Sequence, residues 1–148
     1  TDDLPDFCDY SMQNRTYRYF NGKVQYPFGY GKTYTKFALK NTEVCENKIR
    51  ATVKNVGEFE SETVLQLYVT YPTADFQTPN KSLIDCRRIL LKPQEEKEFE
   101  FEFDETKLLT VNDDGEKVLL SGVYNFYLTD GCDFESKAFS YFQSIENQ

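Results

Sequence analysis

The sequence predicts an all-β protein, an antiparallel two-layer β-sandwich of about seven short strands. Three observations predict it. Apolar and polar residues alternate with a period of two from Tyr34 onward, turn-forming Gly, Asn and Asp separate these stretches, and no stretch has a helical period. The 148 residues suffice for one domain, with or without a long arm, so the stretches are expected to share one core.

The expected strands follow one another with turn signals between them. They span residues 34–40, 49–53, 65–71, 83–91, 99–103, 124–128 and 138–142. Turn-forming residues stand at 55–57, 112–115, 121–122 and 130–131. Phe99, Phe101 and Phe103, for example, alternate with glutamates, which predicts one buried and one solvated face. This number of strands in about 110 residues is typical of immunoglobulin-like or fibronectin type III-like sandwiches.

The first 31 residues differ from the rest of the chain. They hold eight aromatic residues without sustained alternation, and three glycines and two prolines interrupt them. We therefore expect an irregular aromatic connecting arm at residues 1–31, a sandwich at 32–143 and a C-terminal tail at 144–148. Each packed ring buries about 150–250 Å². Either the sandwich itself or another domain is expected to cover these rings.

Composition excludes several classes of function. A net charge of −8 disfavours nucleic acid, and the lack of histidine removes the commonest general base and most zinc sites. No apolar run is long enough to span a membrane. The cysteines, at positions 8, 45, 86 and 132, form no Cys-x-x-Cys pair, so we expect free thiols, no metal and no cofactor. The chain is expected to be soluble. Its unpaired-looking cysteines and the lack of a signal peptide favour the cytoplasm, unless a signal peptide has been removed.

Two acidic segments are candidates for chemistry, and both have a structural interpretation. The glutamates between Glu95 and Glu102 alternate with phenylalanines, which indicates the solvated side of a strand rather than a catalytic pair. The segment 112–115 offers oxygen ligands for calcium, but it lacks the long loop of a dedicated site and is more typical of a hairpin turn. We predict no catalytic and no metal-binding residue.

Several motifs, taken in order, resemble one known domain. They are the segments 15–20, 26–35, 53–57, 64–69, 81–89 and 122–124, which read RTYRYF, YPFGYGKTYT, VKNVG, VLQLYV, KSLIDCRRI and GVY. From about Asp6 to Phe142 the chain is similar to the C-terminal fibronectin type III-like domain of glycoside hydrolase family 3, the β-glucosidases and β-xylosidases. Ser82 stands where this family usually has proline, and Cys86 where it has an aromatic residue.

The resemblance implies an accessory role and no catalysis by this chain itself. In this family the two catalytic carboxylates of a retaining exo-glycosidase lie in upstream domains. The implied partners are those upstream catalytic domains of the same polypeptide, which this domain would stabilise by packing. Excised from them, the arm is expected to fold back or to pair two copies as a homodimer. The alternative is a carbohydrate-binding module, in which Tyr68 and Tyr127 on an exposed face stack on sugars.

Two sets of residues are the candidate sites. Large rings and arginines are typical anchors of interfaces, which makes the arm the candidate for docking to another domain. The docking candidates are Arg15, Tyr17, Arg18, Tyr19, Tyr26, Phe28 and Tyr30. Tyr124 lies where fibronectin-like sandwiches keep a structural tyrosine whose hydroxyl bonds the backbone just upstream, the tyrosine corner.

Overall fold

The computed structural model describes residues 6–133 and 135–144, and its regular elements are almost all strands. The strands are β1 (Phe37–Cys45), β2 (Lys48–Asn55), β3 (Ser61–Thr70), β4 (Ser82–Leu91), β5 (Glu96–Glu102), β6 (Thr110–Val111), β7 (Lys117–Val118), β8 (Gly122–Thr129) and β9 (Glu135–Gln143). Two single turns of helix, α1 (Thr16–Tyr19) and the 3₁₀ turn η1 (Glu105–Leu108), complete the list. The predicted all-β class is confirmed.

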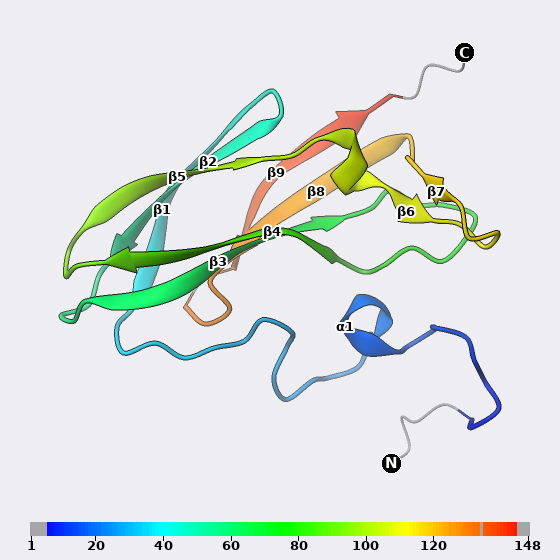
Figure 1. Cartoon of the computed structure of the whole chain (residues 1–148), viewed down its shortest axis with the longest axis horizontal. Helices are drawn as coiled ribbons and strands as arrows, with labels where there is room; N and C mark the ends of the chain where they lie inside the picture. The colour runs from blue at the N-terminus through cyan, green and yellow to red at the C-terminus, as the bar shows by residue number, and fades with distance from the viewer. Residues whose placement is uncertain (1–5, 134, 145–148) are drawn as a thin grey trace.

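The seven long strands form two antiparallel sheets, as predicted (Figure 1). One sheet has the order β1-β2-β5 and the other β4-β3-β8-β9. The short strands β6 and β7 make a separate hairpin between β5 and β8 in the chain. The predicted turn at 112–115 joins them. It is stabilised by the Asn112 side-chain oxygen, which accepts hydrogen bonds from the backbone N–H groups of Asp114 and Glu116.

The core lies between the two sheets and consists of the apolar residues that the alternation placed inward. Fully buried residues include Ile49, Ala51 and Val53 of β2, Leu65, Leu67 and Val69 of β3, Phe101 of β5, and Tyr124, Phe126 and Leu128 of β8. Phe126 stacks on Phe139 with ring centroids 4.5 Å apart. Burial of these side chains is the main force that holds the sheets together.

The first strand begins and ends later than predicted. Tyr34 is 92% exposed and precedes β1, which starts at Phe37 and continues to Cys45. The backbone N–H of Phe37 donates to a carboxylate oxygen of Asp133 at 2.9 Å. Beyond Leu39 a register shift interrupts the ladder with β2, and the side chains there are largely exposed. The second half of β1 is therefore a solvated edge strand. Its two faces do not differ in burial, so the sequence has no alternation of apolar and polar residues there.

The expected divisions at residues 31 and 143 stay a prediction. The first five residues of the expected arm, and 145–148 of the expected tail, lie outside the described residues. Within 6–133 and 135–144, no helix is of the length and apolarity that crossing a bilayer requires.

Candidate docking surface

The arm lies along the outer face of the β4-β3-β8-β9 sheet and is attached to it at two places (Figure 1). The first attachment is Asn80, in the connection between β3 and β4. Its backbone N–H donates to the carbonyl of Arg18, and its side-chain amide donates to the carbonyl of Phe20 at 3.3 Å and to the side-chain oxygen of Asn21 at 2.9 Å. The helical turn α1 is thus held against the sandwich.

The second attachment is a close approach of the backbone at Gly29 to β3. The side-chain amide of Gln66 donates to the Gly29 carbonyl at 2.8 Å, and the Tyr68 hydroxyl donates to the Gln66 side-chain oxygen at 2.7 Å. Gly29 has φ +82°, and a Cβ there would lie 2.0 Å from that same oxygen. A Cβ on Gly131 would lie 2.1 Å from the Gly29 carbonyl oxygen. Only glycine therefore fits at Gly29 without displacement of its neighbours.

The arm covers an outer face that the alternation predicted to be exposed. Tyr68 is only 1% exposed, so the prediction that it stacks on sugars from an open face is wrong. Its burial raises the pKa of the Tyr68 phenol to about 12. Tyr127, the other residue of that expectation, is half-buried. The pair does not form an open aromatic platform.

The rings of the arm itself stay partly or largely exposed. None of the residues 6–31 is buried, and Tyr26, Phe28 and Tyr30 are 64%, 50% and 40% exposed. Tyr17 stacks on Phe28 with centroids 4.0 Å apart and planes 12° apart, and the Tyr26 and Tyr30 centroids are 5.1 Å apart. We call these four residues, Tyr17, Tyr26, Phe28 and Tyr30, the arm rings. They cover one another in part but lack a covering layer within the described residues.

The other docking candidates lie apart from the exposed rings of 26–30. The Arg15 guanidinium donates to the Asp9 carbonyl, within the arm. Arg18 Nε donates to the Tyr17 hydroxyl at 3.4 Å, and this bond is the main reason that the pKa of Arg18 is raised. Arg18 and Tyr19 line a pocket between α1, β4 and β6. Because Tyr17 stacks on Phe28, Arg18 adjoins the arm rings on one side and lines this pocket on the other.

The acidic segments serve structural contacts. The Glu100 carboxylate accepts from Lys48 Nζ at 2.8 Å and from Arg50 Nε at 2.9 Å on the outer face of the β1-β2-β5 sheet. These two cations lower the pKa of Glu100. Among the residues that the structure describes, no group of three or more metal-ligating side chains occurs, and the four cysteines are free and exposed.

Tyr124 bonds the backbone four residues upstream. Its hydroxyl donates to the Leu120 carbonyl at 2.9 Å and accepts from the Leu120 N–H at 3.0 Å. Its ring is fully buried and meets Tyr71 edge-on, with centroids 6.0 Å apart. The hydroxyl thus satisfies both polar groups of one residue at the entry to β8.

Comparison with known proteins finds a matching domain family for the central part of the chain. A model of the fibronectin type III-like domain matches residues 63–131, which run from β3 through β8. Over these residues, a little under half of the chain, the sequence is similar to the fibronectin type III-like domain. In this domain the matched region contains Gln66, Tyr68 and Tyr124, the residues that attach the arm and fix the entry to β8.

The relatives are glycoside hydrolases of family 3, as the resemblance implied. The domain is 29% identical over 143 residues to a putative β-xylosidase of Formosa agariphila, with 88% of this chain and 19% of that protein covered. It is 38% identical over 100 residues to a periplasmic β-glucosidase of Salmonella typhimurium, covering 60% of this chain and 13% of the relative. The chain thus spans less than a fifth of the length of these relatives.

A solved structure shares the same fold. The crystal structure of a β-glucosidase from Listeria innocua superposes with a TM-score of 0.72 and 27% identity, over 84% of this chain and 18% of that one. Family 3 proteins therefore contain this domain as a small part of a larger polypeptide.

Sequence reasoning did not assign the attachment residues Gly29, Gln66 and Asn80. The signal for two of them was present, since Gly29 and Gln66 lie in the segments 26–35 and 64–69 that carry the resemblance. These segments, distant in sequence, meet in space. Asn80 lies in a loop without periodicity, so no pattern could indicate its contacts with the arm.

Proposed function

We propose that this chain is a non-catalytic structural domain of a retaining, exo-acting β-glucosidase or β-xylosidase, and that it stabilises the catalytic domains of the same polypeptide by packing against them. The similarity to both classes of enzyme over a small share of their length supports this proposal. The contribution to catalysis is then indirect, since a displacement of catalytic groups by about 1 Å can reduce a rate on the order of a hundredfold.

The observation that carries the proposal is the state of the arm. Its backbone is fastened to the sandwich by Gln66 and Asn80, yet Tyr26, Phe28 and Tyr30 remain exposed. Contacts within the chain thus explain the path of the arm, but they do not explain why large apolar rings are left exposed on it. Clustered exposed aromatic side chains are typical of surfaces that another protein surface covers.

The test uses the intact polypeptide that contains this domain, with Tyr26 and Phe28 both changed to serine. We expect its thermal inactivation to begin at a lower temperature, because the interface with the catalytic domains loses its aromatic anchors. The matched control is Phe59→Ser, since Phe59 is an equally exposed ring, 63% accessible, in the β2–β3 connection.

Two results would overturn the proposal. One is equal inactivation temperatures for the double variant, the control and the unchanged enzyme. The other is hydrolysis of aryl β-glucosides or β-xylosides by this chain alone that persists through rigorous purification. The first outcome would refute the role of these rings in docking, and the second would refute the non-catalytic role of the domain.

We further propose that residues 1–31 act as a connecting arm, which pairs two copies in a homodimer when the domain is excised. The exposed arm rings support this idea. Light scattering at several concentrations measures it, with a chain that begins at Lys32 as the control. A monomeric mass for both chains at all concentrations would remove the dimer.

Tyr124 is proposed to act as the tyrosine corner of the sandwich. Its two bonds to Leu120 support this role. Tyr124→Phe leaves both backbone groups without this partner, so the free energy of unfolding should fall by about 1–3 kcal/mol in urea. Tyr127→Phe is the control, and equal midpoints for the two variants would argue against the role.

A further inference from the structure

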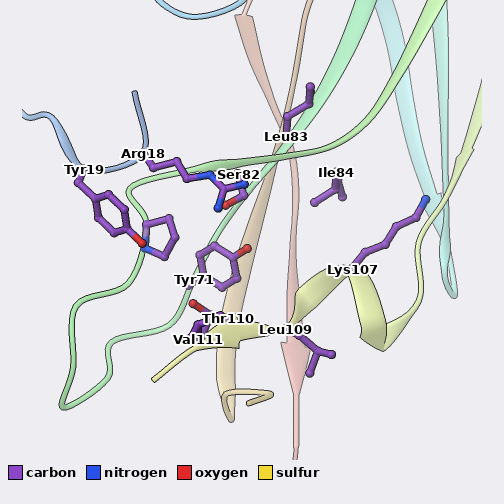
Figure 2. A pocket seen from close by; sticks show the side chains of 11 residues that line it. Arg18, Tyr19, Tyr71, Ser82, Leu83, Ile84, Lys107, Leu109, Thr110 and Val111 are labelled. Atoms are coloured by element: carbon purple, nitrogen blue, oxygen red, sulfur yellow. The ribbon is translucent and has the colours of Figure 1, made fainter. Parts of the chain in front are cut away.

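A pocket of about 270 Å³ lies where the arm meets the sandwich, and no ligand has so far been assigned to it. Figure 2 shows it from close by. The arm supplies Arg18 and Tyr19 from α1, and Tyr71 follows β3 directly. Ser82 and Ile84 come from β4, and Leu109 leads into β6. Asn80 holds α1 against the β3–β4 connection, and α1 contributes Arg18 and Tyr19 to this pocket.

The polar part of the pocket is suited to an anion. In a chain of net charge −8, no carboxylate lines this pocket. The Nε of Arg18 donates to Tyr17, and no ion pair of Arg18 occurs in the part of the chain that the structure describes. The two terminal nitrogens of its guanidinium therefore have N–H groups available, and such a planar pair binds a carboxylate through two parallel hydrogen bonds.

A hydroxyl group beside Arg18 reinforces this preference, and Arg18 is the only cation at that end of the pocket among the described residues. Lys107 lines the same pocket, but its ammonium donates to the Glu102 carbonyl at 2.9 Å, and in Figure 2 it points away from Arg18 and Ser82. Ser82 is buried and offers a hydroxyl donor from β4. In Figure 2 the Arg18 guanidinium and Ser82 appear at one end of the pocket, and Leu109 at another.

The remaining walls are apolar. Ile84, Leu109 and Val111 provide aliphatic surface, and Tyr19 and Tyr71 provide rings. Small-molecule sites commonly combine such walls with a few polar groups that fix the orientation of the ligand. The volume is just below the usual range of such sites and matches a ligand with a single ring.

We propose that this pocket is a binding site for a small carboxylate with an apolar, ring-sized body. The carboxylate pairs with the terminal nitrogens of Arg18 and accepts from Ser82, and the apolar body packs between Tyr71 and Leu109. The site shares Arg18 and Tyr19 with the docking candidates, but Tyr26 and Phe28, the two residues changed in the test of docking, do not line it.

The experiment titrates this chain with sodium benzoate, followed by backbone amide shifts in NMR. We expect saturable shifts at Tyr71, Ser82 and Leu109, with a Kd of about 1 mM or below. Benzamide has the same size without the charge and should bind at least about tenfold more weakly.

Variants locate the site. Arg18→Gln should weaken benzoate at least about tenfold. Arg88→Gln, which removes an exposed arginine that pairs with Glu62 on the outer face of β4, should leave the affinity unchanged. Val111 lies at the exposed edge of the pocket, so Val111→Trp places a large ring in the space for the ligand. We expect this variant to abolish benzoate binding, although it leaves the charge of Arg18 in place.

The outcomes separate the site from its alternatives. The absence of saturable shifts in the unchanged chain would overturn the proposal. Equal weakening by Arg18→Gln and Arg88→Gln would overturn it too, as it would indicate attraction by net charge alone. The amide signals of Gly29 and Gln66 report whether the arm stays attached in each variant. If Arg18→Gln detaches the arm, the test rests on Val111→Trp, and unchanged benzoate affinity in that variant would overturn the proposal.

Discussion

The outer faces of the two sheets differ, although both come from strands with the same alternation of apolar and polar residues. On the β1-β2-β5 sheet the outward residues are charged and solvated, with Lys48 and Arg50 paired to Glu100. On the other sheet Gln66 and Tyr68 also point outward, yet both are buried under the arm. Uncharged side chains with donors and acceptors can bond a passing backbone, whereas exposed ion pairs favour water.

The strongest test of this difference is to force the arm off its sheet. Gly29→Ala places a Cβ at a site with φ +82° and within 2.0 Å of the Gln66 side-chain oxygen. Because both the strain and the clash fall on the attachment point, we expect a loss of about 2 kcal/mol or more in the free energy that holds the arm. Hydrogen exchange at the amides around Gly29 measures it.

Gly31→Ala is the matched control, since a Cβ at Gly31 meets nothing within 4 Å. The alanine at 31 should leave the exchange rates of the arm unchanged. If the two alanine variants exchange alike, the close approach at Gly29 is not what fastens the arm.

A smaller effect is expected from alkaline pH, through Tyr68. Its pKa is raised to about 12 in the folded chain, from about 10 for an unperturbed phenol. The folded state therefore keeps this proton longer than the unfolded state does. The resulting stability is fully present below about pH 10 and is lost as the pH rises from about 10 to about 12.

Urea unfolding at a series of pH values compares the unchanged chain with Tyr68→Phe. The unchanged chain should lose more stability across this window, while the other tyrosines, Tyr124 included, contribute equally to both. Parallel curves for the two chains would mean that Tyr68 is not shielded from water as its burial indicates.

The smallest effect should come from the solvated sheet. Glu100→Gln removes the partner of Lys48 and Arg50, yet exposed ion pairs contribute little and salt screens them. Because the pKa of Glu100 is lowered, its contribution is present above the ordinary glutamate pKa and disappears as the pH falls through the lowered value. Glu96→Gln is the control. A large shift of the urea midpoint, insensitive to salt, would contradict the assignment of this face as solvated.

Periodicity was sufficient to predict which residues form the core. Residues such as Ile49, Leu67 and Phe126 are buried where the alternation placed them, because a period of two separates the faces of a strand. The resemblance added the family relationship, and similarity to glycoside hydrolases of family 3 confirms it.

Periodicity could not predict what covers an outer face. The pattern at Gln66 and Tyr68 is the same whether water or an arm lies over it, so the open platform expected at Tyr68 was wrong. The contacts of Gly29 with Gln66 join residues 37 positions apart. Such long-range contacts depend on tertiary packing and leave no local period.

The attachment of the arm at both Asn80 and Gln66 has a consequence for association rates and affinities. A free peptide with these aromatic residues would lose backbone and side-chain freedom on meeting a partner, whereas here the segment between the two tethers is already ordered. That entropic cost falls on the folding of the domain rather than on the encounter. A partner surface that binds the arm rings therefore meets a segment whose backbone is already held at both ends.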